Sequence, residues 1–248
     1  MLDVDAVLLD LGGVFYLPDH ARIVSALRQL GVTIDPDDLD QAHYEGVAAL
    51  RAPAGPDNPR LDHHGDGSSV WHAYNRAYAS VCGVPDDALD EATRILLAEF
   101  GLGDVWTRVI PGAREALVDL AELDVVLAVV SNADGTVERQ LRDDGICQVG
   151  PGAGVEVGIV LDSGVVGVSK PDPRIFELAL EALQVAPERT IHVGDTPAAD
   201  VEGALAAGVQ PVLIDPYDLH PDAPCARARS LGEVAARLRG ASRVVPPS

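Results

Sequence analysis

Four short apolar runs constrain the fold of this chain more than any other feature of its sequence. They are Ala6–Leu9, Val125–Val130, Thr190–Val193 and Pro211–Ile214. Continuous apolar runs of this length are typical of strands that are buried on both faces of a parallel sheet. A weaker run, Val155–Leu161, predicts one further strand.

Stretches with helical spacing of apolar residues lie between these runs. They predict helices over Ala113–Leu123, Pro173–Leu183 and Val201–Ala207. Strands that alternate with helices predict an α/β fold, in which a Rossmann-like parallel sheet is covered by helices on both faces. Ligands of such sheets bind at the carboxyl ends of the strands, so polar residues at those positions are of most interest.

A long interval after the first strand breaks this alternation. It has no strong strand signal and predicts helices over Ala21–Leu30, Pro36–Leu50, Ser69–Val81 and Asp86–Phe100. We therefore expect an all-helical domain, residues 17–105, inserted into a core formed by residues 1–16 and 106–240. Residues 241–248 contain two prolines and are expected to form a flexible tail.

The charge and the cysteines exclude several classes of function. The net charge of −21 argues against binding to nucleic acid or to an anionic membrane, because both require a basic surface. The three cysteines are far apart, with no C-x-x-C pair, which indicates reduced thiols rather than disulfides or a zinc site. No signal peptide and no apolar run of membrane-spanning length is evident, so we expect a soluble, cytoplasmic protein. The sequence carries no signal for the oligomeric state.

Polar residues gather at the predicted strand ends and at the start of one helix. They are Asp10, Ser131, Asn132, Asp195 and Asp200, with Lys170 just before the helix at Pro173. Each has an ordinary explanation by itself, as a turn residue, a helix cap or a solvated lysine. Parallel strands, however, place their carboxyl ends at one edge of the sheet, so we expect these residues to form one site.

Such a group of residues supports transfer of a phosphoryl group to a carboxylate. Asp10 is placed to act as a nucleophile that forms an acyl phosphate. Mg²⁺ prefers oxygen ligands, and Asp10 and Asp195 are the expected carboxylate ligands. Lys170 and Ser131 would stabilise the charge on the phosphoryl oxygens.

At this point the motifs resemble those of the haloacid dehalogenase-like hydrolases, most of which are Mg²⁺-dependent phosphatases. The matching stretches are, in chain order, LLDLGGV, VVSNA, GVSKPDPRIF and HVGDTPAADVEGALAAG. The resemblance covers residues 1–15 and about 107–240. The inserted helical domain resembles the cap of that family, in its C1 type.

The resemblance implies a role for each residue that matches a motif. Asp10 would be the nucleophile, and Ser131, Asn132 and Lys170 would hold the phosphoryl group. The substrate implied is a small phosphorylated metabolite.

The resemblance also implies a Mg²⁺ site. Asp10, Asp195 and the backbone carbonyl of Gly12 would be its ligands. Asp200 would support the metal shell or orient Lys170.

Gly12 is the one departure from the family pattern. Phosphatases of the family usually carry a second Asp there, as D-x-D, which serves as general acid and base. Dehalogenating members resemble D-x-Y and use no metal, so Gly12 does not favour that subclass. Three interpretations remain open: a Mg²⁺-dependent phosphatase, a 2-haloacid dehalogenase, and a catalytically weak phosphate-binding or regulatory protein.

The inserted domain also contains residues that could face a substrate. They are His43, Tyr44, His63, His64, Trp71, His72, Tyr74 and Arg76. Helical spacing favours Trp71 and Tyr74 as residues of the core of this domain, and the two adjacent histidines lie in a predicted loop.

Overall fold

The computed structural model describes residues 4–50 and 69–242 and divides the chain into two compact units. The core unit contains the described residues up to Phe15, Ile110–Pro216, and those from Asp222 onward, and the cap unit contains Tyr16–Val109 and Tyr217–Pro221. Residues 217–221 therefore group with the cap unit, whereas the predicted boundaries assign them to the core. Of the expected tail, residues 243–248 lie outside the described part, and Ser242 ends a helix.

The core unit is built on a six-stranded sheet with the order β10-β9-β8-β1-β4-β7. All of its strand pairs are parallel, which confirms the predicted fold class. The strands are β1 (Ala6–Leu9), β4 (Val126–Ser131), β7 (Ile159–Asp162), β8 (Thr190–Gly194), β9 (Gln210–Ile214) and β10 (Ala226–Ala228). The first strand lies in the centre, and its Leu9 is opposite Val129 on one side and Val193 on the other.

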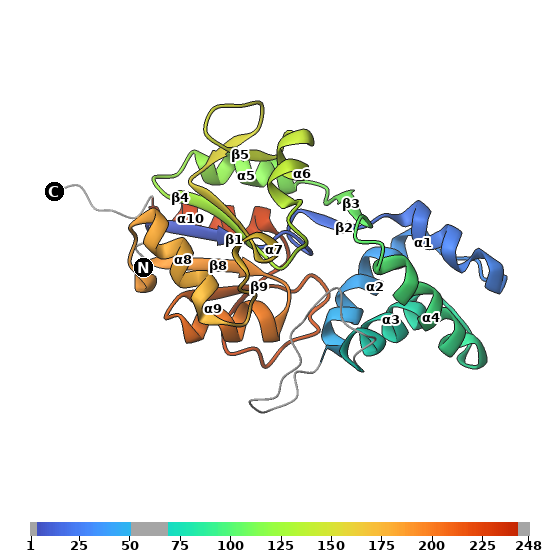
Figure 1. The fold of residues 1–248 in the computed structure, drawn as a ribbon. Coiled ribbons are helices and arrows are strands. Elements are labelled where there is room, and N and C mark those ends of the chain that lie inside the picture. The colour runs from blue at the N-terminus through green and yellow to red at the C-terminus, as the bar shows by residue number, and fades with distance from the viewer. Residues whose placement is uncertain (1–3, 51–68, 243–248) are drawn as a thin grey trace. The chain divides into compact units, whose positions relative to one another are not determined.

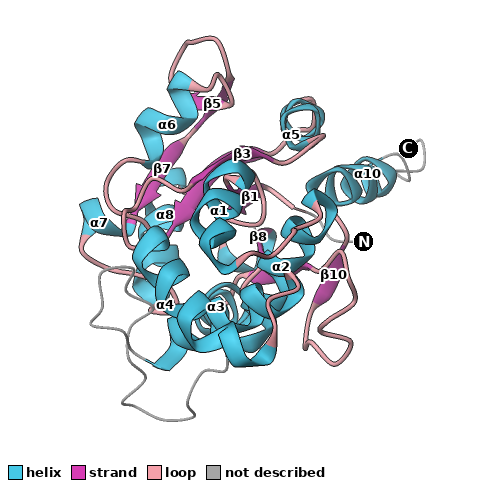
Figure 2. Ribbon diagram, turned by 90° about the vertical axis from the view of Figure 1, so that its right-hand side faces the viewer, coloured by secondary structure: helices cyan, strands magenta, loops and turns pink. Residues whose placement is uncertain are grey.

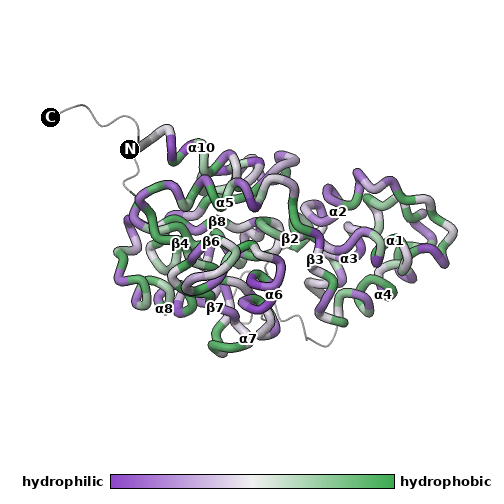
Figure 3. The backbone as a smooth tube through the Cα atoms, turned by 90° about the horizontal axis from the view of Figure 1, so that it is seen from above, coloured by the Kyte–Doolittle hydropathy of each residue, from purple (hydrophilic) through white to green (hydrophobic). Residues whose placement is uncertain are grey.

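Helices cover both faces of this sheet. On one face, α8 (Pro173–Leu183) and α9 (Glu202–Ala206) pack against a buried cluster that includes Leu8, Ala128 and Val130. On the other face lie α5 (Ala113–Ala121) and α10 (Leu231–Ser242), which pack against each other (Figures 1 and 2). The strand β4 is drawn largely green in the hydropathy view, as expected for a strand that is buried on both sides (Figure 3).

The weaker predicted strand, Val155–Leu161, is in fact two strands that belong to different sheets. The first part is β6 (Val155–Val157), which pairs with β5 (Cys147–Val149), whereas the second part is β7 in the main sheet. The break falls at Gly158, where a Cβ atom would lie 2.5 Å from Cδ2 of Leu183. A residue with a side chain would thus displace the side chain of Leu183 at the end of α8.

The remaining elements of the core unit are short. They are α6 (Val137–Asp143), α7 (Ser163–Val166), a 3₁₀ turn (Pro187–Arg189) and a π-helical turn (Pro197–Val201) that leads into α9. The helix predicted from Val201 therefore starts with a wider turn, and such turns are frequent at functional sites.

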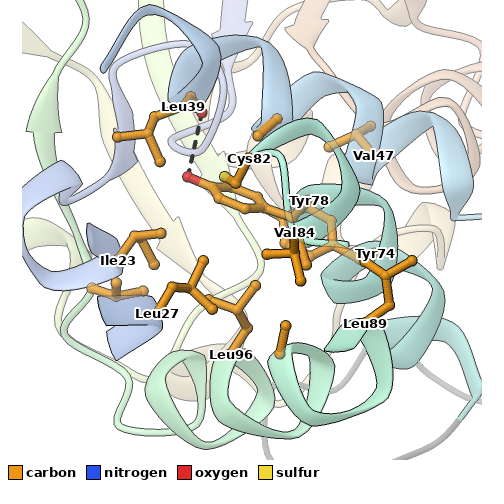
Figure 4. Close-up of a cluster of buried hydrophobic side chains, with 14 of the residues drawn as sticks. Ile23, Leu27, Leu39, Val47, Tyr74, Tyr78, Cys82, Val84, Leu89 and Leu96 are labelled. Atoms are coloured by element: carbon orange, nitrogen blue, oxygen red, sulfur yellow. Dashed lines mark hydrogen bonds between the residues drawn. The ribbon is translucent and has the colours of Figure 1, made fainter. Parts of the chain in front are cut away.

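The cap unit is mainly helical, as predicted. Its helices are α1 (His20–Leu27), α2 (Pro36–Ala49), α3 (Ser69–Val81) and α4 (Leu89–Phe100), with 3₁₀ turns at Arg28–Leu30 and Asp86–Ala88. Their apolar faces enclose a buried cluster in which the hydroxyl of Tyr78 donates to the carbonyl oxygen of Leu39 at 3.3 Å (Figure 4).

A short strand pair lies at the two ends of the predicted helical cap, residues 17–105. Two short strands, β2 (Tyr16–Pro18) and β3 (Trp106–Val109), form an antiparallel pair in this unit. Runs of three and four residues are too short for a periodic signal, and pairing with a partner far away in the sequence cannot be recognised from either run alone. No helix in the described ranges is both long and apolar enough to cross a membrane.

Candidate active site

The site begins at Asp10, immediately beyond the end of β1. The backbone N–H of Asp10 donates to the carbonyl oxygen of Val193 at 2.9 Å, which extends the β1–β8 pairing to this residue. In the strand order, β1 lies between β4 and β8. The chain continues from β1 to β4 and β7 on one side of it, and then crosses to β8 on the other side. Ligands of open α/β sheets bind at this kind of switch point, and the Asp10 side chain is buried there.

Lys170 is the only lysine of the chain, and all other cationic side chains, apart from any protonated histidine, are arginines. It is 1% exposed. Its Nζ lies 2.7 Å from Oδ1 of Asp10 and 2.6 Å from Oδ1 of Asp200. The loop before α8 therefore places the buried ammonium of Lys170 at the end of β1, where the sequence predicted it.

Asp200 is held by several donors. Besides Lys170, Nε2 of His192 lies 2.8 Å from Oδ1 of Asp200, and the backbone N–H of Thr196 donates to Oδ2 at 2.9 Å. Burial alone would raise the pKa of Asp200, but the charge of Lys170 and the bond to His192 outweigh it, and the pKa lies below the usual Asp value. Asp200 is thus a carboxylate, and of the two predicted roles its contacts favour orienting Lys170.

The side chain of Asn132 is bonded to the loop that carries Lys170. Its Nδ2 donates to the carbonyl oxygen of Lys170 at 2.9 Å, and its Oδ1 accepts from the backbone N–H of Lys170 at 2.8 Å. The side chain therefore fixes the backbone that carries the ammonium. Direct binding of phosphate by Asn132 stays a prediction.

Ser131 and Asp162 are paired in register at the ends of β4 and β7, and both are buried. Oδ2 of Asp162 accepts from the backbone N–H groups of Gly135 at 2.9 Å and Val137 at 3.2 Å, and Oδ1 accepts from Gly164 at 2.9 Å. Asp162 thus braces the loop that follows Ser131. It was not among the predicted site residues, although the same search for polar residues at strand ends would have found it.

The charges of the site favour binding of a second cation in addition to the ammonium of Lys170. Burial raises the pKa of Asp10 to about 7, and the charges of Asp200 and Asp195 add to this effect, while the charge of Lys170 opposes it. Three buried carboxyl groups face one ammonium, so the fully ionised cluster carries two excess negative charges. Such a cluster is costly to bury without a compensating cation.

The residues present fit a divalent metal ion. Carboxylate oxygens of Asp10, Asp195 and Asp200 all lie within 4.8 Å of one another. A Cβ atom on Gly13 would lie 2.1 Å from Oδ2 of Asp195, so only glycine permits this position of the Asp195 carboxylate. Oxygen donors of this kind suit Mg²⁺. The role of the Gly12 carbonyl as a ligand stays a prediction.

The candidate substrate residues of the cap unit have partners within that unit. Nδ1 of His43 lies 3.0 Å from the hydroxyl of Tyr74, and both side chains are buried. Trp71 packs against the same cluster, which agrees with the expectation that it and Tyr74 belong to the core of this unit. Arg76 forms an exposed ion pair with Asp90.

Four candidate residues of the cap unit remain. Tyr44 is buried, and its ring centroid lies 5.7 Å from that of Tyr217. His72 is exposed. His63 and His64 lie outside the described residues.

Sequence comparison relates this chain to known proteins. The family model of the haloacid dehalogenase-like hydrolases matches residues 4–208. Phosphoserine phosphatase of Thermus thermophilus is 40% identical over 114 residues, which are 46% of this chain and 43% of that protein. Haloacid dehalogenase-like hydrolase domain-containing protein 3 of Homo sapiens is 30% identical over 196 residues, which are 78% of this chain and 74% of that protein. The alignments with the first four curated relatives cover 43–53% of their length.

A solved structure shows the same fold. The putative HAD-hydrolase YfnB of Bacillus subtilis, bound to magnesium, superposes with a TM-score of 0.57 at 23% identity, covering 95% of this chain and 98% of that chain.

Proposed function

We propose that this chain, which belongs to the haloacid dehalogenase-like hydrolases, hydrolyses the phosphate monoester of a small metabolite with the help of Mg²⁺. One observation carries the proposal. The buried ammonium of Lys170 contacts Asp10 at the switch point of the sheet, beside two further carboxylates. This arrangement combines a nucleophile, a fixed positive charge and the ligands for a divalent cation.

Asp10 acts as the nucleophile. Its carboxylate attacks the phosphorus atom, and the bond from phosphorus to the ester oxygen breaks. The phosphoryl group becomes attached to the Asp10 carboxyl as an acyl phosphate, and the ester oxygen leaves with the bonding electron pair and takes a proton from water. The attacking group must be ionised, and the nearby positive charges of Lys170 and of a bound divalent cation favour the ionised form.

The negative charge of the phosphoryl group is balanced by the surrounding residues. Lys170 offers a fixed ammonium, and Ser131 offers a hydroxyl from the end of β4. Asp10 and Asp195, with the carbonyl of Gly12, would hold Mg²⁺, which supplies further positive charge to the phosphoryl oxygens. These groups allow an anion to bind in a protein whose net charge is −21.

The second half of the reaction releases phosphate. Water attacks the phosphorus atom, the bond to the Asp10 oxygen breaks, and the carboxylate is restored. At position 12 there is no carboxyl group to donate a proton to the leaving oxygen or to accept one from this water. We therefore propose that substrates with good leaving groups, such as acyl, aryl and anomeric sugar phosphates, react best.

The experiment is an assay of p-nitrophenyl phosphate hydrolysis by the purified protein with Mg²⁺, with EDTA, and with Mg²⁺ restored. The proposal predicts activity that EDTA abolishes and Mg²⁺ restores, with Asp10→Asn, purified in the same way, as the control for contaminating phosphatases. Activity that survives EDTA would contradict the metal assignment. Release of halide from a 2-haloacid without hydrolysis of any phosphate would favour the dehalogenase instead. Binding of inorganic phosphate without turnover of any ester would favour the regulatory protein.

A further inference from the structure

We propose that His192 is a positioning residue of this site: through Asp200 it fixes the ammonium of Lys170 against Asp10. The kinetic part of this proposal rests on the phosphatase function proposed above, whereas the structural part does not. His192 lies on β8, opposite Leu8 of β1, and its side chain is fully buried.

One oxygen atom links the histidine to the lysine. Oδ1 of Asp200 lies 2.8 Å from Nε2 of His192 and 2.6 Å from Nζ of Lys170. The other oxygen, Oδ2, accepts from the backbone N–H of Thr196. With a donor fixed on each side, the carboxylate has a single orientation, and the position of the ammonium follows from it.

The second contact of His192 is with Phe176. The two ring centroids are 4.9 Å apart with an interplanar angle of 79°. Phe176 belongs to the apolar cluster between α8 and the sheet, which also contains Leu8. Burying an imidazole costs free energy, and only hydrogen bonds of its ring nitrogens offset that cost. An apolar side chain would fill this space without it. Hydrogen bonding, chiefly to Asp200 and also to the backbone of Leu8, therefore distinguishes histidine from leucine at this position.

Loss of the His192 donor has a defined consequence. Oδ1 of Asp200 would retain Lys170 as its side-chain donor, so the ammonium would be drawn toward Asp200 and away from Asp10. Because the ammonium acts on charge that develops during phosphoryl transfer, the loss should appear in kcat rather than in KM. Replacement of residues that orient the groups of an active site typically costs 10–100-fold, and we expect a loss of about this size.

The single lysine makes a direct measurement possible. Labelling with ¹⁵N-lysine gives one side-chain ammonium resonance, that of Lys170, in the metal-free protein and without turnover. We expect His192→Leu to shift this resonance. His192→Gln, whose amide can still donate to Asp200, should keep it near the wild-type position. Phe176→Leu, the matched control, removes the ring contact but not the hydrogen bond and should also leave the resonance in place.

The kinetic measurement is a double-mutant cycle. His192→Leu should lower kcat in the wild-type background but not in Asp200→Asn, because the histidine acts through that carboxylate. Equal losses in both backgrounds, an unshifted resonance in His192→Leu, or the same shift in Phe176→Leu would each overturn the proposal. If His192→Leu does not fold, His192→Asn, whose amide is too short to reach Asp200, replaces it, and wild-type behaviour of that variant would contradict the proposal. A wild-type protein that hydrolyses no phosphate ester but shows the resonance shift would refute the phosphatase function and support the positioning role.

Discussion

Nζ of Lys170 lies 2.7 Å from Oδ1 of Asp10, a buried contact between the loop before α8 and the end of β1. Burial disfavours the charged forms of both groups, whereas the charge of each group favours the charged form of the other. Burial opposes the charged form of Lys170, yet the carboxylates of Asp10 and Asp200 outweigh it and raise the pKa of the ammonium. The positive charge of the site is therefore constant near neutral pH, and Asp10 is the group of this pair that titrates there.

Asp10→Asn should abolish turnover without loss of the fold. Asparagine is nearly isosteric with aspartate, but its amide cannot form the acyl phosphate. The measurement is the initial rate of p-nitrophenyl phosphate hydrolysis with saturating Mg²⁺, together with a circular dichroism melt of the same sample. A folded variant that keeps more than a small fraction of the wild-type rate would show that another group is the nucleophile.

The titration of Asp10 should lower the stability of the metal-free protein as the pH rises from about 4 to 7. The pKa of Asp10 is about 7 in the folded chain, whereas that of an unfolded Asp is about 3.9. Between these values the folded state binds one proton more than the unfolded state, so the free energy of unfolding decreases with pH. The shift corresponds to at most about 4 kcal/mol at 1.36 kcal/mol per pKa unit.

This pH dependence has an internal control. The lowered pKa of Asp200 acts below about pH 4 and the raised pKa of Lys170 acts above about pH 10, so neither contributes to this window. Burial lowers the pKa of His192, which opposes the effect of Asp10 below about pH 6.5 but is present in both proteins. Urea unfolding in EDTA should therefore show a flatter pH profile for Asp10→Asn than for the wild type, and added Mg²⁺ should stabilise the wild type most at pH 8. Parallel profiles for the two proteins would mean that Asp10 is not the titrating group.

Gly13→Ala should remove metal binding. The new Cβ atom would lie 2.1 Å from Oδ2 of Asp195, and the backbone of Gly13 has φ +65°, which residues with a side chain rarely adopt. The matched control is Gly112→Ala, with φ +80° and no atom within 4 Å of the added Cβ, so it tests backbone strain alone. Calorimetric titration with Mg²⁺ should show binding to the control but not to Gly13→Ala. Equal affinities would show that the Asp195 carboxylate is not a ligand.

Gly12→Asp should change the dependence of rate on the leaving group. In the wild type no acid at position 12 protonates the departing oxygen, so the single-turnover rate should fall steeply as the pKa of the leaving group rises. The added carboxyl group should flatten this dependence and speed alkyl phosphates by about 10²–10⁴-fold, the usual gain from general acid catalysis. A flat dependence in the wild type would show that another residue already donates the proton.

The sequence predicted the parts of this structure that depend on local pattern. The run Ala6–Leu9 and the helix Pro173–Leu183 agree with the structure residue for residue. Since parallel strands end at one edge, the search for polar residues after each run also brought together Asp10, Lys170 and Asp200, which the structure places in contact.

Other features depend on contacts that no local pattern contains. The sequence pattern predicts His192 only as one residue of a buried strand. No adjacent residue in the sequence indicates that its ring contacts Asp200. The resemblance implied that Asn132 helps to hold the phosphoryl group, but it gave no sign that the Asn132 side chain is bonded to the backbone of Lys170. Both contacts depend on the direction of a side chain, which the packing of several elements decides.

The most direct measurement of the central claim is detection of a phosphoryl group on Asp10. The wild type is mixed with an aryl phosphate and Mg²⁺, stopped with acid within one turnover, digested, and analysed by mass spectrometry. Because no carboxyl group at position 12 assists the attack of water, the acyl phosphate should accumulate and appear on the peptide that contains Asp10, as a burst of phenolate equal to the amount of enzyme. Asp10→Asn should show neither. Steady turnover of the ester with no phosphorylated Asp10 peptide and no burst would contradict the account.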